Sequence, residues 1–385
     1  MSDVRHDPTL ALTPPMGWNS WNALGIRVDE AAVLAHAELL VSTGLAELGY
    51  TQVIIDDGWH DGRDRAGRLR PHAGRFPSGI RALADRVHAL GLRLGIYSCA
   101  GVRTCAGLPG SYGMEVEDAA TFAEWGVDYL KYDYCHAPDD RDEAIRRYAR
   151  MGEALRRCGR PIVYAVCEWG SRQPWSFPDL AHGHSARTTF DIIDAWDGNL
   201  DYSNRGASVT QILDRQHGLH TYAAPGRWND LDMLVVGLGG RGYIGGGGCT
   251  DTEYRSHFGL WCLHAAPLII GCDLRTVRPE HLDILRWRAA IAVDQDPCGH
   301  QAERVRREGR CEVFVKALDR GAQAVGLLNR GERPAVIDHK PWGRFRVTDL
   351  GDGADLGVIE NAVGREVPPH GLALLRLDPC GALEG

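Results

Sequence analysis

Val127-Asp-Tyr-Leu-Lys-Tyr-Asp133 decides the fold class, because this largely apolar run comes directly after a helical stretch. The apolar residues between Val116 and Ala123 recur at the spacing of one helix face, and Gly126 is typical of the position just beyond a helix end. The run from Val127 is itself typical of a strand. A strand that follows a helix at once belongs to a strand–helix alternation, so this stretch predicts a parallel sheet with helices packed outside it.

The same order of helix and strand occurs on both sides of this stretch. A predicted helix capped by Ser78 ends at Gly91 and leads into Leu92–Tyr97, and a helix over Asp140–Cys158 leads into Pro161–Val166. Eight strands are expected in all: Met16–Trp21, Thr51–Asp56, Leu92–Tyr97, Val127–Asp133, Pro161–Val166, Ala186–Ile192, Asp232–Val236 and Pro267–Ile270. Eight such units predict an α/β fold, a (β/α)8 TIM barrel over residues 1–300. A doubly wound open sheet is the alternative that periodicity alone leaves open.

Beyond about residue 300 the helical periodicity disappears. Short strand-like runs are separated by Gly, Asp and Pro turns: Cys311–Leu318, Ala322–Leu328, Ala335–Asp338, Phe345–Leu350 and Leu372–Leu377. Strands this short with such turns are typical of antiparallel sheets. Residues 301–385 are therefore expected to form a small C-terminal antiparallel β-sandwich domain.

The composition is that of a soluble globular protein and argues against two classes of partner. The formal net charge is −8 and the basic residues are spread along the chain, so no nucleic-acid surface is expected. The chain has no apolar stretch of about 18 residues, so no membrane span is expected either. The residues do not predict an oligomeric state.

The N-terminus and the cysteines predict a cytoplasmic protein. Met1 to Thr13 contains no apolar run of signal-peptide length. The 11 cysteines are scattered without a Cys-x-x-Cys pair, which argues against a zinc site and against a dense disulfide framework.

Acidic residues and tryptophans lie at or just after the predicted strands. The acids are Asp56, Asp57, Asp133, Glu168, Asp191, Asp230 and Asp232, and the tryptophans are Trp59, Trp169 and Trp228. The carboxyl ends of barrel strands converge on one mouth, so these side chains are expected to share a pocket. A single Asp there is explained equally well as a helix cap, but caps do not require tryptophan. Aromatic rings that stack on an apolar sugar face, beside carboxylates that bind hydroxyls, favour a sugar ligand.

Carboxylates without a metal-binding triad indicate glycoside hydrolysis, which needs one carboxylate to attack the anomeric carbon and another to protonate the leaving oxygen. Asp133 is the candidate nucleophile, because Lys131 lies two residues earlier on the same strand face and favours the ionised carboxylate. Arg187 precedes Asp191 by four residues and would orient that acid or bind a hydroxyl. The residues alone do not choose the partner of Asp133.

A series of motifs runs through nearly the whole chain. It comprises Thr13-Pro-Pro-Met-Gly-Trp-Asn-Ser-Trp21, Ile55–Trp59, Gly95–Tyr97, Thr104–Gly107, Gly126–Asp133, Cys167–Trp169, Arg187–Asp191, Trp228–Leu234, Ala266–Leu268, Asp294–Pro297 and Val367–Gly371. In this order the motifs resemble glycoside hydrolase family 27, which contains α-galactosidases and α-N-acetylgalactosaminidases. The resemblance implies a (β/α)8 barrel with a C-terminal β domain. It also implies retaining hydrolysis of terminal α-D-galactosyl residues by double displacement, without a cofactor or metal.

The resemblance also implies roles for individual residues. The family's nucleophile falls on Asp133 and its acid/base on Asp191. Its galactose subsite falls on Trp21, Asp56, Asp57, Tyr97, Cys105, Lys131, Glu168, Arg187 and Asp232. Glu168 is expected at the sugar's 2-position, where a carboxylate is the α-galactosidase pattern. The family counterparts of Cys105 and Cys135 form a disulfide beside the nucleophile.

Three departures from the family pattern leave the substrate open. Cys99 replaces a frequent Asp, Ala186 replaces a Trp, and the loop Gly237–Gly248 is longer and richer in glycine than usual. The first alternative is a β-L-arabinopyranosidase, whose sugar matches α-D-galactose apart from the C5 hydroxymethyl group. An α-N-acetylgalactosaminidase ranks below it because of Glu168. A non-enzymatic sugar-binding protein is disfavoured, because both catalytic carboxylates are present.

Two further motifs resemble binding sites of other protein classes. Gly237-Leu-Gly-Gly-Arg-Gly242 fits the dinucleotide-binding pattern, but the glycines continue instead of opening a helix, so a flexible loop over the barrel mouth is favoured. His182-Gly-His184 has the spacing of a metal pair, yet no completing ligand set is visible. Surface loop histidines are the expected explanation.

Overall fold

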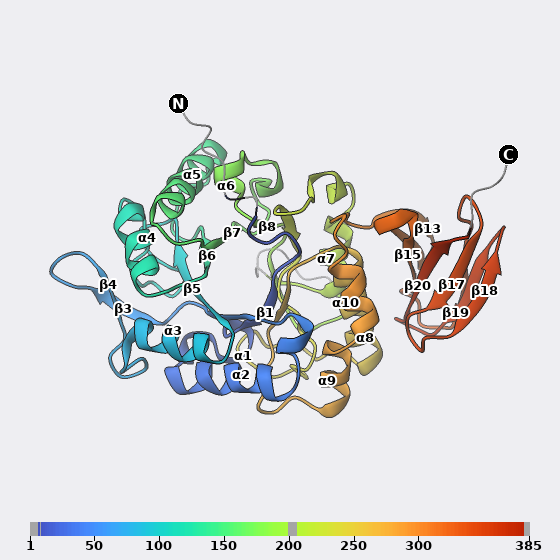
Figure 1. Cartoon of the computed structure of the whole chain (residues 1–385), viewed down its shortest axis with the longest axis horizontal. Helices are drawn as coiled ribbons and strands as arrows, with labels where there is room; N and C mark the ends of the chain where they lie inside the picture. The colour runs from blue at the N-terminus through green and yellow to red at the C-terminus, as the bar shows by residue number, and fades with distance from the viewer. Residues whose placement is uncertain (1–6, 8, 199–205, 381–385) are drawn as a thin grey trace.

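A curled parallel sheet forms the centre of the computed structural model, which describes residues 7, 9–198 and 206–380 (Figure 1). The predicted absence of a signal peptide concerns Met1 to Thr13, of which residues 1–6 and 8 lie outside this part. The sheet has eight strands in the order β11-β8-β7-β6-β5-β2-β1-β12. Their bounds are β1 (Met16–Asn19), β2 (Gln52–Ile55), β5 (Arg93–Cys99), β6 (Tyr129–Asp133), β7 (Val163–Cys167), β8 (Ser185–Arg187), β11 (Trp228–Asp230) and β12 (Leu268–Ile270). A parallel bridge from Leu234 to Ile270 links the two ends of the sheet, so the predicted barrel is confirmed and the open sheet is excluded.

Helices cover the outside of the sheet (Figure 1). They are α1 (Trp21–Leu24), α2 (Glu30–Ser42), α3 (Gly79–Ala89), α4 (Glu115–Glu124), α5 (Arg141–Arg157), α6 (Asp179–His182), α7 (Val209–Arg215), α8 (Asp251–Leu263), α9 (Pro279–Leu285) and α10 (Arg288–Asp294). Asp140 caps α5 by accepting a hydrogen bond from the backbone of Glu143 at 2.7 Å. Ser78 occupies the N-cap position of α3, but its side chain makes no capping hydrogen bond. None of the described helices is long and apolar enough to cross a membrane.

Two predicted barrel strands have different bounds in the structure. The sixth ends at Arg187: the backbone amide of Thr188 still donates to Asp230 in the neighbouring strand, but the chain beyond it no longer pairs with the barrel sheet. The following pair, β9 (Asp191–Ile192), bonds instead to β10 (Gly206–Ala207). The predicted seventh strand is divided: β11 ends at Asp230, Asp232 has a left-handed φ of 74° that interrupts the extended chain, and within the predicted range Leu234 forms the bridge to Ile270. A short hairpin of β3 (His60–Arg63) and β4 (Leu69–Pro71) extends the loop after β2.

The C-terminal part is antiparallel, as predicted. A six-stranded sheet has the order β13-β14-β15-β20-β17-β18, and β16 pairs with β19 beside it. The bounds are β13 (Glu303–Glu308), β14 (Cys311–Ala317), β15 (Gln323–Asn329), β16 (Ala335–His339), β17 (Phe345–Asp349), β18 (Asp355–Ile359), β19 (Val363–Val367) and β20 (Leu372–Pro379). Both sheets contribute to one apolar cluster that includes Val325, Ile337 and Val367. The sequence reading missed β13, β18 and β19, which are partly or largely exposed and carry no clear apolar alternation.

Strand β14 joins the two parts of the molecule through the alternation of its side chains. Val313 lies in the core of the β domain, whereas Phe314 lies in the core cluster of the barrel. Lys316 is fully buried, and its ammonium donates to the carbonyl of Val293 at 2.6 Å and to that of Cys262 at 3.3 Å. These contacts place the β domain against α8 and α10 (Figure 1), away from the carboxyl ends of the barrel strands.

Candidate active site

A pocket of about 130 Å³ lies at the carboxyl ends of the barrel strands. Its lining residues are Trp21, Asp56, Asp57, Tyr97, Cys105, Lys131, Asp133, Trp169, Phe190 and Asp191. Eight of them were predicted for the site, and Trp169 was singled out beside an acid. Phe190 was missed, although it lies next to Asp191 within a quoted motif. Four carboxylates and several aromatic rings therefore face one small space, which suits a polyol ligand.

Asp133 is buried at the end of β6, with only 5% of its surface exposed. Its carboxylate accepts from the backbone of Tyr134 at 2.9 Å and from the Tyr97 hydroxyl at 3.1 Å. Burial raises the pKa of Asp133 from 3.8 to about 7, and Lys131 offsets part of this rise. The predicted effect of Lys131 thus has the right direction, but burial outweighs it.

The pKa of Asp133 predicts how stability depends on pH. The folded protein binds this proton with a pKa of about 7, whereas the unfolded chain binds it near 3.8. The stabilisation from this group is therefore complete below about pH 4 and is lost as pH rises through about 7. We expect the melting temperature of Asp133→Asn to exceed that of the wild type at pH 8, by on the order of 5 °C. Calorimetry at pH 5 and pH 8 measures this.

The control for this experiment is Asp85→Asn, which changes a carboxylate on the exposed face of α3. Equal melting temperatures of wild type and Asp133→Asn at pH 8 would contradict the raised pKa. A smaller fall between pH 5 and pH 8 in the variant than in the wild type is the expected pattern.

Lys131 is held by Asp56 and not by Asp133. Its ammonium lies 2.8 Å from Asp56 Oδ2, which also accepts from Asn19 at 2.8 Å. Asp57 accepts from the backbone amides of Gly58 and Ala106, both at 2.8 Å. Burial raises the pKa of Asp57 above its usual value and the neighbouring Asp56 adds to the rise, although the amides of Ala106 and Gly58 offset part of it. The two carboxylates are thereby fixed in place as acceptors for sugar hydroxyls.

Asp191 lies at the mouth of the pocket, and 42% of its side chain is exposed. Arg187 donates to it at 2.7 Å and also pairs with Asp232 at 2.5 Å. Arg187 and Asp232 do not line the main pocket. Together with Asp230 and Lys131 they line a smaller cavity of about 20 Å³ inside the barrel. Arg187 therefore acts on the site through Asp191, and Asp232 acts through Arg187 and through the backbone amide of Ile192, which donates to it at 2.7 Å. Burial raises the pKa of Asp232 to about 6, although Arg187 lowers it.

Glu168 does not line the pocket, so the expectation that it binds the sugar is not supported by its position. It is fully buried, and both carboxylate oxygens accept from the backbone amide of Arg172 at 3.0 and 2.9 Å. The Arg172 side chain adds a contact at 3.0 Å and reaches Asp139 at 2.7 Å. The residue that reaches the pocket from this turn is Trp169, which has a left-handed φ of 60°. Glu168 and Arg172 thus form a buried ion pair, called the clamp below, within the turn that carries the left-handed Trp169.

We expect Arg172→Met to lower stability and to reduce kcat/KM, because Glu168, the neighbour of Trp169 in this turn, would lose its cation inside the protein. Breaking a buried pair from one side costs about 3–5 kcal/mol. Thermal unfolding and kcat/KM for a p-nitrophenyl α-galactoside measure the two effects. The matched control is Arg157→Met, which breaks the exposed pair with Glu153 on α5. Unchanged unfolding in Arg172→Met would contradict the clamp.

Trp59 and Trp228 also lie outside the pocket lining. Both are fully buried, and their indole N–H groups donate to the backbone carbonyls of Tyr97 at 2.9 Å and Ala11 at 2.7 Å. They are packing residues whose polar atoms are satisfied within the protein. Proximity to an acid in the sequence was therefore a useful signal only for Trp169.

A disulfide joins Cys105 and Cys135 at the side of the pocket, with Cα atoms 5.2 Å apart. These two cysteines and Asp133 are the one group of possible metal ligands that lie close together among the described residues. Sulfurs bonded to each other do not act as thiolate ligands, so this group does not fit a metal site. Cys99 is buried, and its thiol donates a hydrogen bond to the backbone carbonyl of Cys135 at 3.3 Å. Ala186 is fully buried. Neither lines the pocket.

The histidine pair at the start of β8 is buried and not on the surface as expected. His182 is fully buried, and His184 is 3% exposed. The ring of His184 accepts from the backbone amide of Tyr164 at 2.9 Å. The pair precedes β8 and lies at the amino ends of the strands, so it takes no part in the carboxylate-lined pocket.

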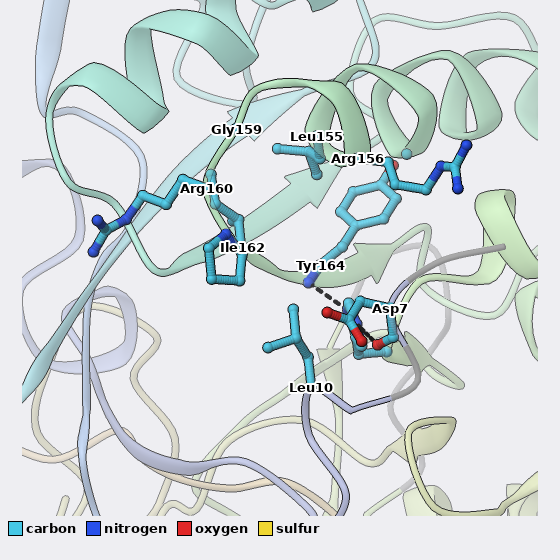
Figure 2. A pocket seen from close by; sticks show the side chains of 11 residues that line it. Asp7, Leu10, Leu155, Arg156, Gly159, Arg160, Ile162 and Tyr164 are labelled. Carbon is cyan, nitrogen blue, oxygen red and sulfur yellow. Dashed lines mark hydrogen bonds between the residues drawn. The ribbon is translucent and has the colours of Figure 1, made fainter. Parts of the chain in front are cut away.

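A second, larger cavity of about 380 Å³ opens at the amino ends of the strands (Figure 2). Figure 2 shows Arg156 and Arg160 directed to opposite sides, with Leu10, Leu155 and Tyr164 between them. The one carboxylate in its lining is that of Asp7. Hydrolysis of a glycoside needs two, so the smaller pocket is the candidate active site.

Residues 13–296 match the family described as alpha galactosidase A, and residues 308–377 match the alpha galactosidase C-terminal beta sandwich domain. The chain belongs to this family. The glycoside hydrolase family 27 resemblance is therefore confirmed, as is the identification of the chain as a glycoside hydrolase.

Relatives of this family are similar over almost the full chain. An alpha-galactosidase A from Cellvibrio japonicus is 41% identical over 390 residues, covering 96% of this chain and 93% of the relative. The structure of alpha-galactosidase I from Mortierella vinacea superposes with a TM-score of 0.91 at 36% identity, covering 97% and 99% of the two chains. A β-L-arabinopyranosidase from Geobacillus stearothermophilus superposes with a TM-score of 0.85 at 25% identity, covering 98% and 100%.

Proposed function

We propose that this family member is a retaining exo-glycosidase that hydrolyses terminal α-D-galactosyl residues. The observation that carries the proposal is the contrast between two carboxylates of one pocket. Asp133 is buried at its base, whereas Asp191 lies half-exposed at its mouth. Double displacement requires one carboxylate that attacks the anomeric carbon and a second that protonates the leaving oxygen, and the carboxylate nearer the solvent suits the second role. The family's α-galactosidases support the choice of sugar.

In the first step the ionised carboxylate of Asp133 attacks the anomeric carbon. The glycosidic C–O bond breaks, and Asp191 gives its proton to the leaving oxygen. The Tyr97 hydroxyl bonds to Asp133, so it helps to hold the attacking oxygen in place. In the second step Asp191 takes a proton from water, whose oxygen attacks the same carbon from the opposite face and releases Asp133. Two inversions leave the product with the anomeric configuration of the substrate.

Arg187 is a positioning residue in this scheme. It joins Asp191 to Asp232 and keeps the carboxyl group at the mouth in one orientation while the proton moves in both directions. Asp56 and Asp57 are assigned to the axial 4-hydroxyl and its neighbour, and Trp21 and Trp169 to the apolar sugar faces. Cys105, Tyr97 and Lys131 complete the wall of the pocket.

The β-L-arabinopyranosidase alternative rests on a structure of the same fold. We favour galactose as the sugar, because the α-galactosidase relatives are more similar to this chain in sequence and in structure than the β-L-arabinopyranosidase is. Glu168 lies outside the pocket lining and does not discriminate against an α-N-acetylgalactosaminidase. That activity is disfavoured because Trp169 and Phe190 line a pocket of only about 130 Å³, which leaves little room for an N-acetyl group. Cytoplasmic location remains a prediction, and the Cys105–Cys135 bond does not support it, since disulfides persist mainly in oxidising compartments.

The proposal is tested with p-nitrophenyl α-D-galactoside, β-L-arabinopyranoside and α-N-acetylgalactosaminide. The galactoside is expected to be the fastest substrate. Proton NMR during the first minutes of hydrolysis is expected to show α-galactose before mutarotation. Initial release of β-galactose would contradict retention. Faster turnover of the arabinopyranoside than of the galactoside would change the proposed substrate to an arabinoside and leave the proposed mechanism unchanged.

A further inference from the structure

The glycine-rich loop Gly237–Gly248 is bound to the segment that carries Asp191. Asp194 is fully buried, and its carboxylate accepts from the backbone of Gly240 at 2.7 Å and of Cys249 at 3.1 Å. Its own carbonyl accepts from Gly248 at 2.9 Å, and the Tyr254 hydroxyl donates to the same carboxylate. An amide that already binds a carboxylate is not free to bind a phosphate. The bond from Gly240 to Asp194 therefore argues against a dinucleotide-binding role for this motif. The loop is also more firmly held than the expected flexible loop.

Close approach explains several of the glycines in this loop. A Cβ atom on Gly246 would lie 2.6 Å from the Asp194 carbonyl, and one on Gly242 would lie 2.6 Å from the Asn22 carbonyl. Both residues also have positive φ angles, of 118° and 99°. The loop therefore follows one path: it leaves Asp194 at Gly240, reaches Asn22 at Gly242, and returns to Asp194 at Gly246 and Gly248.

At the Trp21 side the loop presents Tyr243. The backbone amide of Tyr243 donates to the Asn22 carbonyl at 2.7 Å. Its ring packs on Gly25, where an added Cβ would lie 2.4 Å from ring carbons, and meets the Trp21 ring edge-on at a centroid distance of 4.9 Å. Even so, 47% of Tyr243 remains exposed. Tyr243 is thus an aromatic ring held beside Trp21, a lining residue of the pocket, with nearly half of its surface open to solvent.

We propose that Tyr243 forms the subsite for the leaving group, where the second sugar or an aromatic aglycone stacks on its exposed face. This inference rests on the proposed function. The leaving oxygen must lie beside Asp191 at the mouth, so the group attached to it extends past the rim that this loop forms. Tyr243 lies on that rim and outside the lining of the galactose pocket. It therefore contributes to the choice of leaving group and not to recognition of galactose.

Three substrates that share galactose and differ in the leaving group test the inference: melibiose, p-nitrophenyl α-galactoside and α-galactosyl fluoride. Tyr243→Ala is expected to lower kcat/KM for the first two by about tenfold, which is the value of one aromatic contact. Turnover of the fluoride should stay within about twofold of the wild type, because fluoride makes no stacking contact. Inhibition by free galactose should be unchanged. Tyr243→Phe should behave as the wild type, because the ring face is what the inference requires.

Tyr222→Ala is the matched control, since Tyr222 is another partly exposed tyrosine and lies outside the lining of the pocket. An equal loss on all three substrates, or no loss on any, would overturn the inference while leaving the proposed function intact. If the wild type hydrolyses arabinosides instead, the same leaving groups on that sugar repeat the comparison. No wild-type turnover of either sugar would overturn the proposed function and this inference together.

Discussion

Asp133→Asn is expected to lower kcat for p-nitrophenyl α-galactoside by about four orders of magnitude or more, the scale seen when a catalytic nucleophile is removed. The amide is nearly the same size as the carboxylate. Its oxygen can accept from the backbone of Tyr134 while its NH2 group donates to the Tyr97 hydroxyl oxygen, so the pocket should keep its shape. An amide is a poor nucleophile, however, and no covalent intermediate forms. Steady-state kinetics with the purified variant measure the loss, and binding of free galactose should persist.

The matched control is Asp128→Asn. Asp128 directly precedes β6, the strand that ends at Asp133. Asp128 pairs with His88 at 2.7 Å and with Arg160, far from the pocket lining, so its loss should affect stability and not turnover. Azide adds a positive test, because it can replace the missing nucleophile in Asp133→Gly and attack the opposite face of the substrate. The expected product is β-galactosyl azide. Substantial turnover by Asp133→Asn without azide would show that another group attacks the sugar.

The base of this pocket could be predicted from the sequence because it depends on strand ends. Asp56, Lys131 and Asp133 lie on or directly after buried parallel strands, and the carboxyl ends of such strands meet. The alternation of side chains along β6 correctly placed Lys131 and Asp133 on one face. Little depends on loops here, so periodicity and residue type were sufficient.

The mouth of the pocket could not be predicted in the same way. Glu168 and Trp169 are neighbours in the chain, but only Trp169 faces the sugar site, because its left-handed backbone reverses the direction of the turn. Similarly, β8 ends at Arg187, and Asp191 reaches the pocket through an ion pair and through the pairing of β9 with β10. The ion pair of Arg187 with Asp191 follows the predicted spacing of four residues. The left-handed turn at Trp169 and the pairing of β9 with β10, by contrast, have no signal in the local pattern.

Asp191→Ala is expected to discriminate between leaving groups. A sugar leaving group needs a proton, so kcat/KM for melibiose should fall by about 10³-fold or more, within the range of general acid catalysis. 2,4-Dinitrophenolate leaves without a proton, so kcat/KM for its α-galactoside should change little. The second step still needs a base for water, and kcat for the dinitrophenyl substrate should therefore fall as the covalent intermediate accumulates. A burst of dinitrophenolate in stopped-flow absorbance measures that accumulation.

The fold should survive this change, because Arg187 keeps its contact with the buried Asp232 when Asp191 is lost. Asp197→Ala is the control, since this exposed acid lies on the same segment and outside the pocket lining. Azide, which needs no general base, should restore kcat in Asp191→Ala by attacking the intermediate and should yield α-galactosyl azide. That product has the opposite anomeric configuration to the one expected from Asp133→Gly, because azide replaces water in one variant and the nucleophile in the other. The same azide anomer from both variants would contradict the assignment of the two carboxylates, since only one nucleophile and one acid/base on opposite faces of the sugar give this pair of products.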